Sequence, residues 1–422
     1  MNNLIIDRLH PQNWPFSLEL LPQPAYMVGG AVRDAILGRS REYLDLDFII
    51  PDDAVKVART IAKHYQAGFV LLDAERNIAR VVFPHATADF AQQEGESLFT
   101  DLHRRDFTIN AIAYNPHTQE IIDPLQGCAD IETGILRMIS RQNLKDDPLR
   151  LMRAYRQAAQ LNFTIEPSTQ DTIRNLATDI SKVASERIRV EIGYILDIDQ
   201  GTEWLKTAWE DGVLESFFTN INSKNLQKLA AVDQAASLII ARWPELEKEL
   251  QTPIRDTIKT TWLGIAKLAC LVHPNPEFAE SELLEITYSR AEIRGVTTTL
   301  RMFAELQKAK DMSLREQYFL FQNLSNVFFA TTTFALADDI LKVKDNTLET
   351  YENAIKRYLN PHDLVAHTSP LVSGKEVILK LNIPASPLIG KILTEIAIAQ
   401  AEAKISTAEE ALEFAKKVIR NS

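Results

Sequence analysis

The chain has 422 residues, 45% of them hydrophobic and 24% charged, with a formal net charge of −11. These values are ordinary for a water-soluble protein, and the length predicts about two to four subdomains. The negative charge argues against wholesale electrostatic attraction to nucleic acid, although a local basic groove is compatible with it. No segment is apolar over the length of a membrane span, and the first residues lack the pattern of a signal peptide. We therefore expect a cytoplasmic protein.

Cysteine usage argues against two kinds of site. Only Cys128 and Cys270 occur, and they are far apart in the sequence. Neither a disulfide framework nor a zinc site built from cysteine pairs is expected, and a reducing compartment fits this composition.

The predicted elements change in kind along the chain. Residues 1–24 are expected to form an extension, because prolines at positions 11, 15 and 22 interrupt any long helix. From residue 25 to about 137, short apolar runs predict strands, with one helix over 52–66. The predicted strands are 25–28, 46–50, 68–73, 78–83, 86–91 and 120–124. From residue 138 onward the pattern predicts helices almost exclusively, so the fold class is α+β: a small mixed α/β region followed by an all-helical remainder.

The segment 26–50, YMVGGAVRDAILGRSREYLDLDFII, contains the most informative pattern. Its apolar start, 26–28, predicts a strand and Gly29-Gly30 a turn, after which residues 31–37 begin a helix. In such a turn, backbone N–H groups converge where an anion would bind. Gly29 and Gly30 are therefore candidates for binding phosphate.

Two carboxylates follow in the same segment. Asp45 and Asp47 lie two apart in a predicted buried strand, so both side chains leave one face and can hold one or two hard cations. A lone Gly-Gly is more often a packing turn, and a lone Asp-x-Asp more often a solvated strand edge. Together, about fifteen residues apart, they favour a nucleotide site with magnesium.

Asp89, in the predicted strand 86–91, admits two interpretations. It could supply a third carboxylate to a two-metal centre for phosphoryl transfer. It could equally be a partly exposed residue near the end of a strand.

The block HRRDFTINAIAYN, residues 103–115, adds two arginines. Arg104 and Arg105 could clamp the oxygens of a triphosphate in bidentate fashion. Asp106 and Asn110 could fix these arginines or hold sugar hydroxyls. Without this context, the motif would be an ordinary salt-bridge cluster.

The block KDDPLRLMRAYRQ, residues 145–157, predicts a helix with a charged stripe and an apolar side. The stripe consists of Asp147, Arg150, Arg153 and Arg156. The positions expected to face a core are Leu149, Met152 and Ala159. A solvated face with ion pairs is the ordinary explanation. However, a carboxylate beside a guanidinium matches the donor and acceptor order of cytosine, and similarly of adenine, but not of uracil or guanine. Such a pair could read a base in place of a template.

In this order, the blocks resemble the bacterial (class II) tRNA nucleotidyltransferase and poly(A) polymerase family. The matching blocks are GGAVRD with DLD, RRDFTINA, DPLQGCADI, DDPLRLMRAYRQ and SERIRVE, and a weaker likeness covers LVSGKEVILKLNIPASPLIGKIL. The resemblance implies a nucleotidyltransferase head over 25–137, a helical neck over 138–200, a helical body over 201–360 and a helical tail over 361–422.

The resemblance also implies roles for residues. Asp45 and Asp47 would hold the metals, with Mg²⁺ as the cofactor, and Asp147 and Arg150 would read the incoming base. Contacts with the nucleotide or its triphosphate would come from Gly30, Arg33, Arg104, Arg105, Arg153 and Arg156. Such enzymes join CMP and AMP, from CTP and ATP, to the 3′ end of tRNA without a nucleic-acid template.

Two departures from the family pattern concern specificity. The base-reading helix is expected to start with Asp146-Asp147, where the family usually has Glu-Asp. The connection 90–103 is shorter than the flexible loop that complete CCA-adding members share, and members without that loop tend to stop after CC. Because re-aiming the base-reading pair for adenine needs a movable element, we expect CC addition.

Several alternatives to CC addition stay open. Within the family these are full CCA addition, A-only addition and poly(A) synthesis. Outside the enzymes, the chain could be a tRNA-binding protein with an inactive head.

Overall fold

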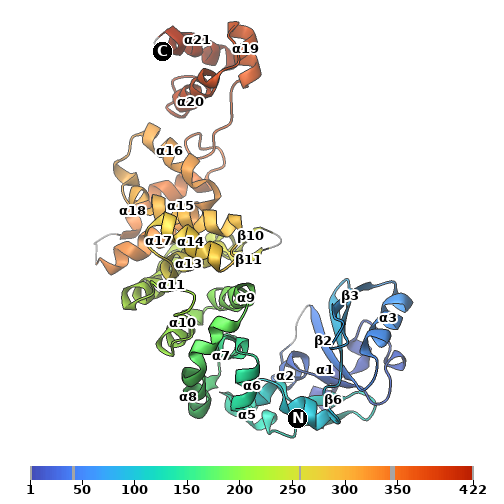
Figure 1. The fold of residues 1–422 in the computed structure, drawn as a ribbon. Coiled ribbons are helices and arrows are strands. Elements are labelled where there is room, and N and C mark those ends of the chain that lie inside the picture. The colour runs from blue at the N-terminus through green and yellow to red at the C-terminus, as the bar shows by residue number, and fades with distance from the viewer. Residues whose placement is uncertain (1, 40–42, 256–257, 343–346, 421–422) are drawn as a thin grey trace. The chain divides into compact units, whose positions relative to one another are not determined.

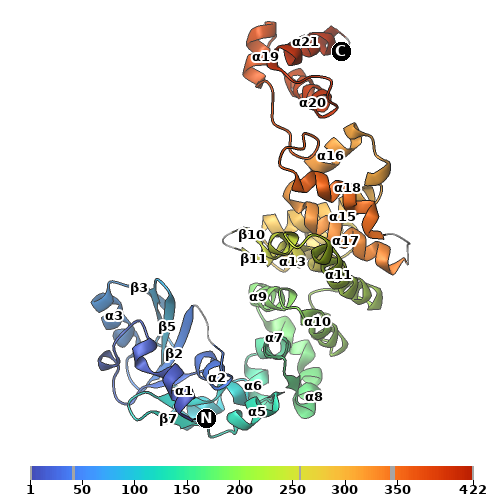
Figure 2. The same cartoon turned by 180° about the vertical axis from the view of Figure 1, so that it is seen from behind.

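The computed structural model describes residues 2–39, 43–255, 258–342 and 347–420. Part of the segment 26–50 and parts of the predicted body therefore lie outside the described residues. The chain forms two compact units, Met1–Glu191 with Thr207–Ser216, and Ile192–Lys206 with Phe217–Ser422. In Figure 1 and Figure 2 the main sheet is blue to cyan and belongs to the first unit, whereas the second is almost entirely helical. The fourfold division into head, neck, body and tail stays a prediction.

The strands are β1 (Tyr26–Val28), β2 (Leu44–Ile50), β3 (Gly68–Asp73), β4 (Ile78–Phe83), β5 (Ala86–Gln92), β6 (Ala113–Asn115), β7 (Glu120–Ile122), β8 (Ile135–Leu136), β9 (Thr164–Ile165), β10 (Pro253–Arg255) and β11 (Ile258–Thr261). The helices of the first part are α1 (Asn2–Leu9), α2 (Gly30–Ile36), α3 (Ala54–Tyr65), α4 (Leu98–His103), α5 (Gly127–Thr133), α6 (Arg141–Asp146), α7 (Leu149–Leu161), α8 (Pro167–Leu176), α9 (Ser185–Leu196) and α10 (Gly201–Glu210). Those that follow are α11 (Ser223–Arg242), α12 (Leu246–Gln251), α13 (Trp262–Leu271), α14 (Pro276–Glu285), α15 (Arg290–Leu306), α16 (Leu314–Leu324), α17 (Phe328–Leu341), α18 (Thr347–Leu359), α19 (Gly374–Leu381), α20 (Pro387–Ala401) and α21 (Ala408–Arg420). The 3₁₀ turns are η1 (Pro11–Asn13), η2 (Leu18–Leu20), η3 (Thr108–Asn110), η4 (Ala177–Lys182), η5 (Ala309–Asp311) and η6 (Ser325–Val327).

A mixed sheet organises the first unit. Its strand order is β3-β4-β5-β2-β1-β6-β7, and β2 and β5 pair in parallel while the other neighbours are antiparallel. All six strands predicted from the sequence are present, with shifts of one or two residues at their ends. The prediction missed β6, because a three-residue strand gives almost no periodic signal.

Aromatic side chains fill one side of this sheet. The rings of Phe48 on β2 and Phe90 on β5 stack with centroids 5.3 Å apart. Trp14 and Phe16, from the N-terminal extension, pack against Phe48 at 5.0 and 5.7 Å. Because strand side chains alternate between faces, these aromatic contacts leave the neighbouring acidic positions to the opposite face.

The predicted base-reading helix is broken, which corrects the sequence analysis. Asp146 ends α6, and Asp147 has extended backbone angles (φ −133°, ψ 91°) before Pro148, after which α7 begins. The residue before a proline is disfavoured in the helical region, so Asp147 cannot continue α6 into α7. Arg150, Arg153 and Arg156 do share α7, but Asp147 sits at the break. The predicted apolar positions of α7, Leu149, Met152 and Ala159, are buried.

Helices α11, α13, α15 and α17 pack on one another in the second unit. The expectation of an all-helical remainder is slightly wrong, since β10 and β11 form a hairpin and β9 pairs with β8. Strands of two to four residues are too short for a periodic pattern. Within the described ranges, no helix is both long and apolar enough to cross a membrane.

Gly127 provides a test of the packing that supports η3. A Cβ at this position would lie 2.3 Å from the Thr108 carbonyl oxygen, so α5 could not stay in place against η3. We expect Gly127→Ala to lower the free energy of unfolding by about 1–3 kcal/mol, in the range of overpacked cores. Urea unfolding followed by circular dichroism would measure this. Gly193→Ala in α9 is the matched control, because a Cβ at this position would meet no atom within 4 Å beyond its chain neighbours and its own helix backbone. This change should be neutral or slightly stabilising. Equal effects of the two changes would contradict the prediction.

Candidate active site

Carboxylates from two adjacent strands form the centre of the candidate site. Asp45 and Asp47 lie on β2, and Asp47 is the register partner of Asp89 on the parallel strand β5. Asp45 is opposite Thr87, whose hydroxyl donates to Asp45 Oδ1 at 2.7 Å. The predicted same-face arrangement of Asp45 and Asp47 is present, and β5 adds Asp89 beside it.

The ionised form of Asp47 is unfavourable in the protein without a bound cation. Its burial, and then the neighbouring carboxylates of Asp45 and Asp89, raise the pKa of Asp47 from 3.8 to about 7. Arg105 and Arg80 lower this pKa, but they do not cancel the other effects. A divalent cation between hard oxygen donors would supply the missing compensation.

The glycine turn brings the chain against these carboxylates. Gly29 has φ +73°, and a Cβ there would lie 3.1 Å from Asp47 Oδ2. The position therefore requires glycine both for its backbone angle and for the close approach. Gly30 then begins α2, so the start of this helix lies beside Asp47, and Gly30, Asp45 and Asp47 also line one hollow.

A buried polar cluster around Asp106 joins η3 to α7. Asp106 is only 4% exposed, and its carboxylate accepts from Asn110 Nδ2 at 2.9 Å and pairs with Arg153 at 3.0 Å. Although burial alone would raise it, Arg153 and Asn110 hold the pKa of Asp106 below its usual value. Asn110 Oδ1 in turn accepts from Arg33 Nη1 at 2.8 Å, and Gln157 bonds the same amide.

This cluster revises part of the sequence interpretation. Asp106 and Asn110 fix arginines, as one alternative held, but their side chains bond Arg153 and Arg33. Of the adjacent pair, Arg105 meets Asn110 only at its backbone oxygen, to which Arg105 Nη1 donates at 3.4 Å. The guanidinium of Arg33 is buried and also bonds Asp34 Oδ1 at 2.8 and 3.0 Å. Arg33 therefore holds the turn and η3 together, whatever else it contacts.

A polar cavity of about 410 Å³ lies between one edge of the sheet, formed by residues of β2, β4 and β5, and the helices α6 and α7. Its charged lining residues are Arg76, Glu94, Asp101, Arg104, Arg105, Asp146, Asp147, Arg150 and Arg187. Arg150 Nη1 donates to the backbone oxygens of Arg104 at 2.8 Å and Asn143 at 3.1 Å. Its guanidinium is thus fixed 4.0 Å from Asp147. The volume lies in the range of small-molecule sites.

The predicted arginines do not all face this cavity. Arg104 and Arg105 line it, and they pair with Glu94 and Asp101. By contrast, Arg156 points away into an ion pair with Glu191 on α9. The arginines of the predicted stripe therefore have different surroundings. Arg150 lines the cavity, Arg153 pairs with Asp106, and Arg156 pairs with Glu191 on α9.

Comparison with known proteins identifies the family. A family model described as the poly A polymerase head domain matches residues 25–137. Models of an RNA-binding site of polymerase A and of tRNA nucleotidyltransferase domain 2 match 162–224 and 257–415. A CC-adding tRNA nucleotidyltransferase from Synechocystis sp. is 45% identical over 408 residues, covering 96% of each chain. The chain belongs to the tRNA nucleotidyltransferase family.

More distant members of the tRNA nucleotidyltransferase family also match along the chain. A CC-adding enzyme of Geobacter sulfurreducens is 27% identical, covering 93% of this chain and 91% of its own. An A-adding enzyme of Deinococcus radiodurans is 28% identical, with coverage of 94% and 96%. The solved structure of a tRNA-processing enzyme in an apo form superposes with a TM-score of 0.64 at 25% identity, covering 89% and 93%. The chain is thus a nucleotidyltransferase, and the predicted α+β fold is confirmed.

Sequence reasoning missed three residues that the fold brings to the site. Arg187 on α9 lies 3.4 Å from the Asp147 carboxylate, Thr87 bonds Asp45, and Arg80 on β4 pairs with Asp89. Thr87 stands two residues before Asp89, as Asp45 does before Asp47, so its face could have been predicted. Arg80 and Arg187 depend on tertiary register and gave no local signal.

The raised pKa of Asp47 predicts how stability changes with pH. A folded-state value near 7, above the usual 3.8, means that the folded protein holds this proton more tightly, so stability is lost as pH rises from about 4 towards 7. In metal-free protein kept in EDTA, Asp47→Asn should remove this part of the pH dependence and be more stable than the wild type at pH 8. Urea unfolding at pH 5 and pH 8 measures it. Parallel pH dependences in both proteins would contradict the expectation.

Proposed function

We propose that this nucleotidyltransferase adds CMP from CTP to the 3′ end of tRNA, twice in succession and without a nucleic-acid template. The observation that carries the proposal is the 45% identical relative, whose name is CC-adding tRNA nucleotidyltransferase. Members at 27–28% identity include both CC-adding and A-adding enzymes. They support the reaction class without deciding the nucleotide.

Asp45 and Asp47 are the residues proposed to hold Mg²⁺. Their oxygens are the hard donors that magnesium prefers. The raised pKa of Asp47 reflects first its burial and then the negative charge of Asp45 and Asp89, which the neighbouring arginines do not cancel. Mg²⁺ bound there would promote attack of the RNA 3′-hydroxyl on the α-phosphorus and would neutralise charge on the departing pyrophosphate. Thr87 orients the Asp45 carboxylate through its hydroxyl hydrogen bond.

Arg105 and Arg153 are the best supported candidates for contacting the triphosphate. In the part of the chain that the structure describes, Nε of each is buried without a hydrogen-bond partner. An unpaired buried donor is costly, and a phosphate oxygen would satisfy it. Arg105 and Arg153 also form ion pairs, with Asp101 and Asp106, so the unpartnered Nε is what sets them apart. The other proposed contacts have weaker support, because among the described residues none of them has a buried side-chain donor without a partner. They are Gly29, Gly30, Arg33, Arg104 and Arg156.

Asp147 and Arg150 are proposed to read the base from the wall of the cavity. Backbone oxygens fix the Arg150 guanidinium, and Arg187 holds the Asp147 carboxylate. A fixed acceptor beside fixed donors suits N4, N3 and O2 of cytosine. Uracil and guanine would leave a polar group unpaired, which supports strong discrimination.

The short connection after β5 supports the restriction to C. Only residues 93–97 separate β5 from α4, and Asn143 Nδ2 donates to the backbone oxygens of His103 and Arg105 at 2.6 and 2.7 Å. The wall of the cavity is thus tied to the end of α4. Little chain is free to move the base-reading pair towards adenine.

End-specific incorporation assays test this proposal. Transcripts of tRNA ending at the discriminator, at C or at CC are incubated with CTP or ATP and Mg²⁺. We expect CMP on the first two ends and no AMP on the CC end. Rapid AMP addition to the CC end would instead indicate a CCA-adding or A-adding enzyme, and repeated AMP addition poly(A) synthesis.

A double variant, Asp45→Asn with Asp47→Asn, serves as the inactive control in these assays. It should bind tRNA like the wild type but lose incorporation by more than about 10³-fold. Binding by the wild type with no incorporation on any end would favour the non-enzymatic alternative, a tRNA-binding protein with an inactive head.

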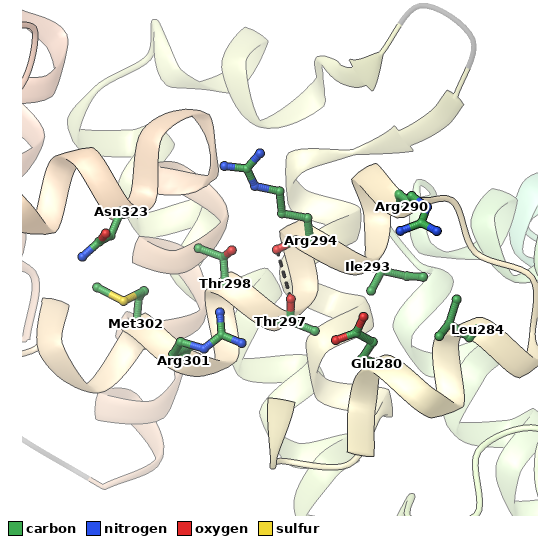
Figure 3. A pocket seen from close by; sticks show the side chains of 10 residues that line it. All are labelled: Glu280, Leu284, Arg290, Ile293, Arg294, Thr297, Thr298, Arg301, Met302 and Asn323. Atoms are coloured by element: carbon green, nitrogen blue, oxygen red, sulfur yellow. Dashed lines mark hydrogen bonds between the residues drawn. The ribbon is translucent and has the colours of Figure 1, made fainter. Parts of the chain in front are cut away.

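The helical second unit offers a surface for the RNA backbone, which we name the arginine hollow. Residues of α14, α15 and α16 line this hollow of about 740 Å³, shown in Figure 3. Arg290, Arg294 and Arg301 on α15 are exposed around it, and within the described ranges no carboxylate lies at ion-pair distance from them. Although Glu280 also lines the hollow, arginines that form no ion pair in a chain of net charge −11 suit phosphate groups, which position RNA without reading sequence.

Replacing two of these arginines tests the hollow. We expect Arg294→Ala with Arg301→Ala to weaken tRNA binding about tenfold and to reduce the slope of log Kd against log salt by about 1–2, because two phosphate contacts are lost. Fluorescence anisotropy between 50 and 200 mM salt would measure both, within the range where such contacts dominate. Arg315→Ala on α16, whose arginine is already paired with Glu395, is the matched control. Equal losses in the two proteins would contradict the assignment.

A further inference from the structure

The third carboxylate of the site, that of Asp89, forms an ion pair with Arg80. Arg80 on β4 is the register partner of Asp89 on β5, which is itself the register partner of Asp47 on β2. The three side chains thus form a row across three neighbouring strands. Arg80 Nε and Nη2 donate to the two oxygens of Asp89 at 2.6 and 2.8 Å.

This bidentate pair engages both carboxylate oxygens of Asp89. Fork-to-carboxylate geometry is the strongest form of ion pair that arginine makes, and the Asp89 side chain is only 18% exposed. Across the residues that the structure describes, no group of three acidic, histidine or cysteine side chains is arranged to hold a metal. Asp89 is therefore turned to Arg80 and does not complete a three-carboxylate cluster with Asp45 and Asp47.

We propose that Arg80 competes with divalent cations for Asp89, so that the free enzyme offers a cation only the Asp45 and Asp47 carboxylates. This inference rests on the proposed Mg²⁺ role of those two residues. Magnesium is commonly held by one or two carboxylates together with substrate phosphates. By occupying the third carboxylate, Arg80 keeps the nucleotide-free site weak for cations and makes tight cation binding depend on the nucleotide.

Direct cation binding to the whole protein tests the proposal. The titration of Mn²⁺, followed by electron paramagnetic resonance, is carried out without nucleotide and at one pH for all variants. Arg80→Met should tighten Mn²⁺ binding about fivefold to tenfold, because Asp89 is released from its ion pair. Arg80→Lys, which keeps the charge but loses the fork, should give a smaller gain. Unchanged or weaker binding in Arg80→Met would overturn the proposal.

Two further variants separate competition from a general charge effect. If Arg80 acts through Asp89, adding Asp89→Asn to Arg80→Met should abolish the gain, since the released ligand is gone. Arg59→Met, which removes an exposed positive charge from α3 in the same unit, should leave Mn²⁺ affinity unchanged. A gain that persists without Asp89, or that Arg59→Met reproduces, contradicts competition.

The failure of this inference is distinguishable from failure of the proposed function. If Mn²⁺ binding does not depend on Asp45 and Asp47, the proposed cation site itself is wrong. If binding depends on them but not on Arg80, only the competition fails. Circular dichroism of each variant in EDTA checks that it folds. If Arg80→Met does not fold, Arg80→Lys still tests the proposal.

Discussion

The parallel pairing of β2 with β5 is the constraint on which the site depends. In its register, Asp47 is opposite Asp89 and Asp45 is opposite Thr87. A slip of one residue would turn a strand's acidic side chains towards the aromatic layer, because side chains alternate with a period of two. The stacked rings of Phe48 and Phe90 disfavour that slip. The aromatic contact on one face of the sheet thus helps to fix which acidic side chains lie together on the other face.

The Asp106 cluster extends this order from the sheet to the helices. A buried ionised carboxylate is destabilising unless its hydrogen bonds are fully made, and removing one partner leaves an expensive unpaired charge. Asp106 meets this condition through Arg153 of α7 and Asn110 of η3. Since Asn110 also binds Arg33 beside the glycine turn, one connected network links α2, η3 and α7. The geometry of α7, which follows the break at Asp147, and the geometry of the glycine turn beside Asp47 are therefore coupled.

The features predicted correctly from the sequence are those that depend on local residue patterns. Alternation placed Asp45 and Asp47 on one face, and the strands of the sheet followed from apolar runs bounded by turns. Helical periodicity identified the buried side of α7. It also led us to place Asp147 in that helix, although a residue before a proline is disfavoured in the helical conformation. The partners of individual charges were beyond local pattern. Arg80 meets Asp89 only through the register of β4 with β5, and Arg187 meets Asp147 only because α9 packs near the helix break.

The first residues of the chain belong to the structure of the sheet rather than to a separate appendage. The head-domain match begins at residue 25, yet Trp14 and Phe16 are almost completely buried against Phe48 and its neighbours. A fragment cut at the family boundary would leave these rings facing water, with a corresponding loss of hydrophobic stabilisation. The piece of chain shared by a family and the piece that can fold by itself need not begin at the same residue.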